Sequence, residues 1–343
     1  PDFTWETVTQ MDFGFDASFL NNRLTGTFDW YRRNTKDMLV AGATLPATLG
    51  ASVPKSNSAD MKTIGWELSL GWNDRLENGF SYWVKGVLSD YQATITKYAG
   101  NDAGFYSQSD GDGKYYVGQK IGEIWGYHSN GLFQSDDEAA TIDQSELYAG
   151  KWGAGDVKYE DLDNDGKITK GEETIYNPGD KSIIGNKTPR YQFGITVGFD
   201  YKNFDFEMFW QGTGKRDYML SGAQFWGFTS QWDVPYTPAL DYWTETNTDA
   251  YFPRPGWQNG GNRVTSDRYL QSAAYGRLKN LTVGYTIPKN LTTKWGISRL
   301  RLYVTGENLL TITPLNDAFD PETLGGMTYP INRKVAIGLN LTL

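Results

Sequence analysis

Residues Tyr275 to Leu310 read YGRLKNLTVGYTIPKNLTTKWGISRLRLYVTGENLL and predict two strands joined by a turn. In the first strand, mostly apolar residues alternate with polar or small ones: Lys279, Leu281, Val283, Tyr285 and Ile287 against Asn280, Thr282, Gly284 and Thr286. The second strand alternates in the same way, with Leu300, Leu302 and Val304 against Arg301, Tyr303, Thr305 and Glu307. Because successive strand side chains point to opposite faces, each strand has one apolar and one polar face. A soluble sandwich would place the apolar face on a core, whereas a membrane barrel would place it on lipid and the polar face on a lumen.

The same alternation recurs along the whole chain, in residues 13–19, 64–72, 191–199, 204–210 and 335–343. It predicts about ten antiparallel strands of roughly ten residues each, an all-β fold. Two sets of side chains then follow for a transmembrane barrel. The lipid-facing set includes Ile195, Val197, Leu339 and Leu341, and the lumen-facing set includes Gln192, Thr196, Asp200, Arg301 and Glu307.

The connections between these strands fall into two classes. Short turns, such as Asn21-Asn22, alternate with long loops at 34–62, 92–190 and 212–273. Loops of this length are unusual in compact soluble domains. Short turns at one end and long loops at the other are typical of outer-membrane barrels, whose long loops are extracellular.

Composition narrows the class of protein. The 343 residues include no Cys, which excludes a disulfide framework and a Cys nucleophile. A formal charge of −9 argues against nucleic acid as a partner. The 13 Trp and 22 Tyr suit membrane-interface girdles or carbohydrate-binding surfaces. No run of ~18 apolar residues predicts a transmembrane helix. The chain starts at Pro1 rather than Met, so we expect a processed product or a part of a longer protein.

One motif carries specific chemistry. Residues 161–172, DLDNDGKITKGE, match the twelve-residue calcium loop at every position. The candidate ligands are Asp161, Asp163, Asp165, the backbone carbonyl of Lys167, Thr169 and Glu172, with Asp180 as an extra carboxylate. The flanks do not predict paired helices, so this is an isolated loop rather than an EF-hand. We expect a structural Ca²⁺ that stiffens the long loop. The alternative is an Asp/Gly-rich surface turn without metal.

Other residues give weaker signals. His128 is the only histidine, so a site built from several imidazoles is excluded, and we expect this ring to be solvated. Trp226, Trp232 and Trp152 lie in the long loops and could contact a substrate or a lid protein. Internal packing of the loops explains these Trp residues as well.

Several stretches, in order along the chain, resemble the SusC/RagA family of TonB-dependent outer-membrane transporters of Bacteroidetes. They include PDFTWETVTQ at 1–10, FDWYRRNTKD at 28–37, GLFQS at 131–135 and GDVKY at 155–159, followed by the calcium-like loop. Further along are IGNKTPRYQFG at 184–194, YWTETNT at 242–248, YFPRP at 251–255, YGRLKNLTVGYTIP at 275–288 and GENLLTIT at 306–313. Two positions depart from the family pattern: the last residue, Leu343, is not aromatic, and Gly276 replaces a larger residue.

The resemblance implies that residues 1–343 are the C-terminal part of a plugged barrel of about 22 strands in the bacterial outer membrane. The family's N-terminal domain, TonB-interacting box and plug are not in this sequence. By resemblance the whole protein is not an enzyme but an importer, driven by the TonB complex through its plug. It would pair with a SusD-like surface lipoprotein, with dimers of such pairs as a further expectation. We expect the cargo to be an oligosaccharide, with a peptide as the alternative.

Two readings outside the family remain open at this point. One is a secreted β-rich carbohydrate-binding or hydrolytic protein with a structural calcium. The other is a passive porin without energy coupling, which would have an open lumen.

Overall fold

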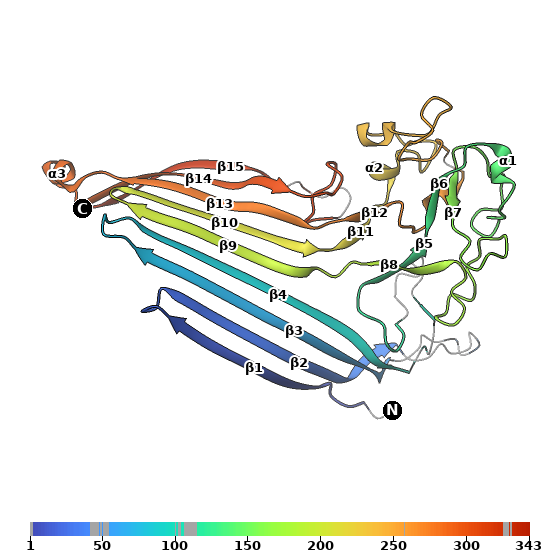
Figure 1. The fold of residues 1–343 in the computed structure, drawn as a ribbon, viewed down its shortest axis with the longest axis horizontal. Coiled ribbons are helices and arrows are strands. Elements are labelled where there is room, and N and C mark those ends of the chain that lie inside the picture. Colours follow the sequence, from blue (N-terminus) through green and yellow to red (C-terminus); the bar gives the residue numbers. More distant parts are fainter. Residues whose placement is uncertain are drawn as a thin grey trace.

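The computed structural model describes residues 3–343, except 42–47, 49, 51–54, 100, 102–103, 106–114, 257, 325–328 and 330. Its main feature is one antiparallel sheet of nine strands, in the order β1-β2-β3-β4-β9-β10-β13-β14-β15 (Figure 1). The strands are β1 (Thr7–Phe19), β2 (Leu24–Ala41), β3 (Lys55–Arg75), β4 (Ser81–Tyr98), β9 (Arg190–Tyr201), β10 (Phe204–Lys215), β13 (Tyr275–Thr286), β14 (Arg299–Ile312) and β15 (Lys334–Thr342). The all-β prediction is confirmed, with nine strands in this sheet rather than about ten.

The sheet is open among the described residues. β1 pairs with β2 alone, and β15 pairs with β14 alone, so each has one edge without a strand. An unpaired edge exposes a row of backbone N–H and C=O groups, which cannot be left in a bilayer. The two unpaired edges therefore predict further strands, which would extend this sheet into the complete wall of a barrel.

Short turns gather at one end of the sheet, and long loops gather at the other (Figure 1). At the short-turn end, Asn21 and Asn22 adopt positive φ between β1 and β2, and Lys202 does so between β9 and β10. The longest connection there carries α3 (Lys289–Thr292) and the 3₁₀ turn η5 (Thr293–Trp295). Asn readily takes the left-handed conformation, which matches the predicted tight turn at Asn21-Asn22.

The loop end holds two stretches of mostly irregular chain, one between β4 and β9 and one between β10 and β13, which we call the two loop layers. The first contains β5 (Glu123–Tyr127), β6 (Ser129–Leu132), α1 (Asp136–Ala139), β7 (Val157–Tyr159) and β8 (Lys181–Asn186). The second contains β11 (Asp217–Met219), α2 (Ala223–Trp226), η3 (Thr237–Leu240), η4 (Gly260–Arg263) and β12 (Leu270–Ser272). The strands extend further than their patterns predicted, because β4 continues to Tyr98 and β10 to Lys215. Of the predicted loop 34–62, residues up to 41 and from 55 are strand, and most of the remainder lies outside the described residues.

The hydrophobic core lies in the loop layers rather than against the sheet. Tyr159, Tyr269 and Phe225 are almost fully buried at its centre, and Phe252 and Trp226 surround them. The sheet, in contrast, exposes large apolar side chains: Phe13 is 67%, Ile337 83% and Leu339 61% exposed. A soluble sandwich would bury such a face, whereas a barrel wall presents it to lipid. No helix among the described residues is long and apolar enough to cross a membrane.

Candidate functional site

The polar face of the sheet brings the predicted lumen residues together. Asp200 lies directly opposite Asp205 on the neighbouring strand, and Arg301 lies opposite Asn340. Further along, the Thr282 and Thr305 hydroxyls are 3.0 Å apart across β13 and β14. Alternation thus places a continuous polar surface on one side of the wall, as predicted.

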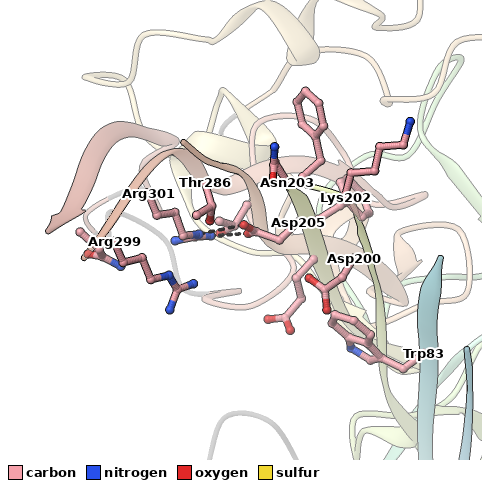
Figure 2. A pocket seen from close by; sticks show the side chains of 13 residues that line it. Trp83, Asp200, Lys202, Asn203, Asp205, Thr286, Arg299 and Arg301 are labelled. Carbon is pink, nitrogen blue, oxygen red and sulfur yellow. Dashed lines mark hydrogen bonds and ion pairs between the residues drawn. The ribbon is translucent and has the colours of Figure 1, made fainter. Parts of the chain in front are cut away.

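A cavity of about 640 Å³ lies on this face near the short-turn end (Figure 2). The Arg301 guanidinium donates two hydrogen bonds to the Asp205 carboxylate, one from Nε and one from Nη2. The Nε–Oδ1 distance is 2.9 Å. The Asp200 and Glu207 carboxylates also line the cavity, and among the described residues neither makes an ion pair. Sequence reasoning missed the Asp205–Arg301 pair, although both residues lie on the polar faces of their strands. Lys202 and Arg299 line the same cavity, so it presents charged groups of both signs to another part of the protein.

On the polar face, large aromatic side chains lie directly over glycines of the neighbouring strands. We call these positions glycine seats. A Cβ at Gly198 would lie 2.2 Å from the Trp83 ring, and one at Gly338 would lie 2.3 Å from the Tyr303 ring. Gly65 stands in the same relation to Tyr31. Real Cβ atoms do not approach so closely, so each ring lies flat on the backbone because the residue beneath it is Gly.

A β-bulge corrects one prediction for the first strand of the opening stretch. The registers of β13 against both β10 and β14 shift at Lys279, which the alternation had placed on the apolar face. Against β10 the bulge adds one residue to β13, whereas against β14 two residues of β14, Asn308 and Leu309, face Lys279 alone. These extra residues reverse the alternation beyond this point. Lys279 Nζ instead lies 3.1 Å from Glu322 Oε2.

The reversed alternation also turns Arg277 toward the loop after β14. Its side chain is 3% exposed, and its Nη2 donates to Asp320 Oδ2 at 2.6 Å. Arg277 Nη1 lies 2.9 Å from Glu322 Oε1, and Nε donates to Thr311 Oγ1 at 2.8 Å. This cluster fastens the loop that carries the buried residues Leu315 and Phe319. The alternation of apolar and polar residues in the sequence does not indicate the bulge that creates this cluster.

A buried network of polar side chains, centred on Asp156, joins the two loop layers. The Asp156 side chain is 3% exposed and accepts from Asn262 Nδ2 at 2.8 Å and from Gly153 N–H at 2.9 Å. Arg254 Nη2 lies 3.3 Å from the same carboxylate, and Asn262 Oδ1 accepts from Val157 N–H. Burial raises the pKa of nearby Tyr159 well above its ordinary value. The two layers therefore form one unit, which sequence patterns did not indicate.

The three loop tryptophans have different environments. Trp226 is 8% exposed, and its ring centroid lies 4.5 Å from that of Tyr269. Trp152 is partly buried and stacks edge-on against Tyr159. Trp232 is 83% exposed. Of the three, Trp232 alone presents its ring to solvent, whereas Trp226 and Trp152 pack the interior of the loop layers.

His128 bridges three segments and is not simply solvated, contrary to expectation. Its Nδ1 lies 2.7 Å from Asp267 Oδ2, and its Nε2 lies 2.7 Å from Ser182 Oγ. The same Asp267 carboxylate accepts from Ser129 N–H. The ring thus ties the β5–β6 region to β8 and to the segment before β12.

The calcium-like loop folds into a tight turn around Asp161. Asp161 accepts from the N–H groups of Asn164, Asp165 and Gly166, and Gly166 has φ +84° at the position of the sharp turn. Burial alone would raise the pKa of Asp161, but these N–H donors lower it. This arrangement keeps the carboxylate charged and fixes its direction.

Three carboxylates converge in this loop. Oxygens of Asp161, Asp163 and Asp180 all lie within 4.8 Å of one another, whereas Glu172 is exposed outside this group. Desolvation and the neighbouring carboxylates, acting against a hydrogen bond from Asp165 N–H, raise the pKa of Asp163. Asp180 is 1% exposed and is held by Leu162 and Thr169 N–H. Among the described residues, Asp180 and not Glu172 joins Asp161 and Asp163 in this group.

The wall, its polar face and its long loops match known proteins. The family described as TonB dependent receptor-like, beta-barrel, matches residues 1–309. The chain belongs to this family. Among curated TonB-dependent receptors, P3 of Formosa agariphila is 30% identical over 98% of the chain and 34% of its own length. SusC of Bacteroides thetaiotaomicron is 26% identical over 98% of the chain and 32% of its own length.

Solved structures support the same fold. A solved structure of the RagAB peptide transporter superposes on this TonB-dependent receptor barrel with a TM-score of 0.75. The identity is 22%, over 98% of the chain and 35% of that protein. The chain thus spans about a third of the length of the relatives it matches. As a family, TonB-dependent receptors are outer-membrane transport proteins and not enzymes, and the nine-stranded sheet is part of their β-barrel wall.

Proposed function

We propose that this chain is the C-terminal wall of a TonB-dependent importer. The observation that supports this most directly is the sheet with one polar and one exposed apolar face, open at β1 and β15. The rest of the protein would supply the missing strands and a plug, on which the TonB complex acts. Unpaired lumen carboxylates at Asp200 and Glu207 are available to such a plug. A passive porin would instead leave them facing open water.

We propose an oligosaccharide as the cargo. Trp232 and Tyr176 are 83% and 81% exposed in the loop layers, and flat exposed rings stack on sugars. Peptide import is the second candidate, because RagAB, a peptide transporter, has the same fold.

The cargo is tested by measuring binding of defined oligosaccharides and peptides to the whole transporter by calorimetry. For oligosaccharide cargo, Trp232→Ala and Tyr176→Ala should each weaken saccharide binding by about 0.5–1.5 kcal/mol, roughly two- to tenfold. Trp295→Ala is the matched control, because this Trp is 63% exposed at the short-turn end. Binding of peptides alone would overturn the oligosaccharide assignment, and a protein stable in plain buffer would overturn the membrane assignment.

We propose that a SusD-like surface lipoprotein covers the joined loop layers. These layers form one unit at one end of the wall, held by Asp156, which suits a surface that must stay rigid under a lid. Mild solubilisation of native membranes should co-purify a lipoprotein, and the mass of the complex tests for dimers of pairs. A transporter that is recovered alone under these conditions contradicts the pairing.

We propose that Ca²⁺ binds between Asp161, Asp163 and Asp180. Support comes from the converging oxygens and from the mutual repulsion that a divalent cation would relieve. Asp163→Asn and Asp180→Asn should each remove the ion in elemental analysis and increase proteolysis of residues 161–180. Glu172→Gln is the matched control and should keep the ion. Absence of a divalent ion from the wild-type protein refutes the proposal.

A further inference from the structure

A row of polar side chains that includes two lysines crosses the apolar face of the wall near the loop end. Strand register places Asn34 opposite Lys62, Lys62 opposite Thr94, and Thr94 opposite Lys120. Directly opposed residues share a face, so this row lies on one side of the sheet. Arg32 lies on the same face one step lower, opposite Ile64. Its Nε donates to Asn34 Oδ1 at 3.3 Å.

This face is the lipid-facing one. Two and four residues below Ile64, the same register joins Trp30 to Trp66 and Phe28 to Leu68. Neither the row at Lys62 nor the pair below it, Ile64 with Gln92, contains a carboxylate. The first carboxylate below them is Asp90, opposite Trp66, and Arg190 neutralises it. The cations are thus gathered where the apolar face ends.

The height of the row matches the edge of a bilayer. Trp72, at the short-turn end of this face, is hydrogen-bonded through its Nε1 to the Tyr82 hydroxyl. From Trp72 to Lys62 the chain runs ~33 Å along β3, at ~3.3 Å per residue. With a strand tilt of ~40°, this corresponds to ~25 Å along the barrel axis, the height of the apolar band of an outer-membrane barrel. Lys62 therefore stands at the level of the outer-leaflet headgroups.

A cavity of about 570 Å³ adjoins the end of the row. Lys120 and Lys215 line it together with the exposed ring of Tyr191. Tyr191 has φ +54°, a conformation that costs a non-glycine residue energy and is common at binding sites. β4 and β9 are paired up to Ser89 and Gln192, and the cavity lies beyond this point.

The carboxylates around this cavity are already engaged. Asp90 is bound by the Arg190 guanidinium, and Asp217 accepts from Asn186 N–H at 2.9 Å. Glu123 accepts from the Tyr116 hydroxyl at 2.6 Å. The two lysines make no ion pair within the described part of the chain, so they are available to an anion from outside.

We propose that Arg32, Lys62 and Lys120 bind the phosphate groups of a glycolipid headgroup in the outer leaflet, with a sugar ring seated against Tyr191. Each basic residue at a membrane surface attracts anionic headgroups by about a fivefold gain in affinity. Neighbouring strands are ~4.8 Å apart, so Lys62 and Lys120 stand ~10 Å apart and can engage separate phosphates. The inference rests on the proposed placement in the outer membrane and not on the cargo.

The test uses the whole transporter in detergent and native mass spectrometry, with bisphosphorylated lipid A as the probe. The triple variant Arg32→Gln, Lys62→Gln, Lys120→Gln should bind the probe about a hundredfold more weakly than the wild type. The matched control removes three cations elsewhere, Lys85→Gln, Lys289→Gln and Lys294→Gln, and should bind it like the wild type. Lys62→Arg with Lys120→Arg should also retain binding, because the charges remain.

Further probes test which chemical groups of lipid A are recognised. Dephosphorylated lipid A should bind as weakly to the wild type as lipid A does to the triple variant. Phosphatidylglycerol and inorganic phosphate should bind less tightly than lipid A, because each lacks the phosphorylated sugar. Equal binding of lipid A to wild type and triple variant overturns the proposal, and so does equal binding of the dephosphorylated probe. Cargo uptake is measured separately, so failure of the cargo proposal leaves these results interpretable.

Discussion

Replacing Arg277 with Met should release the loop after β14 without disturbing the sheet. Met keeps much of the buried volume and removes the charge and all hydrogen-bond donors of the guanidinium. The Asp320 and Glu322 carboxylates, 25% and 20% exposed, then lose their shared partner. Leu315 and Phe319 in this loop belong to the hydrophobic core, so its release would also expose apolar surface.

The free-energy cost of Arg277→Met depends on how well the two carboxylates are stabilised without the guanidinium. Removing one partner of a buried ion pair costs about 3–5 kcal/mol. Both carboxylates are partly solvated and Glu322 keeps Lys279, so we expect about 2–3 kcal/mol. The population with an open loop should therefore rise roughly 30- to 150-fold.

Hydrogen exchange of the whole protein in nanodiscs measures this opening. The reporting amides are Phe319 and Leu324, which donate within the loop to Asn316 and Asp320 carbonyls. Arg299→Met is the matched control, since Arg299 makes no ion pair among the described residues. Unchanged exchange in Arg277→Met would refute the reasoning, and so would equal acceleration in the control.

Three further changes probe the loop layers and the wall. Asp156→Ala leaves buried donors unpaired and should cost about 3 kcal/mol, seen as faster exchange in both loop layers. Gly198→Ala places a methyl group against Trp83 and should lower the free energy of unfolding by about 1–3 kcal/mol, whereas Gly86→Ala, with open space around it, should change it little. Hydrogen bonds from a neighbouring hydroxyl and from backbone N–H groups hold the pKa of Asp233 below 3.8, so the stabilisation it gives its turn is complete above pH 3.8 and lost as pH falls through the folded pKa. Local Trp fluorescence should therefore be constant above pH 4 and change only in stronger acid.

Local periodicity predicted the wall well, because a strand's two faces are set by its own residues. The alternation in β9 and β14 placed Asp200 and Arg301 on the same polar face, as the structure has them. The outcome at Lys279 differs because the bulge against β10 adds a residue to β13 without changing the apolar or polar character of the sequence. Periodicity counts positions, and it cannot detect a shift of one position that the partner strands impose.

The loop contacts depend on pairs far apart in sequence, so local patterns could not reveal them. His128 meets Asp267 across 139 positions, and Asp156 meets Asn262 across 106. The calcium-like loop could be predicted in part from local sequence. Its spacing predicted the turn at Gly166 and the convergence of Asp161 with Asp163, which are local. The choice of Asp180 over Glu172 depends on how the chain returns after residue 172.

The glycine seats beneath Trp83, Tyr303 and Tyr31 set the clearance inside the wall. A ring that lies flat adds only its own thickness to the backbone, whereas an upright ring would project as a peg. The inner surface is thus nearly smooth at these points despite its aromatic content. In the proposed importer, a moving plug or cargo would slide past these rings and not catch on them.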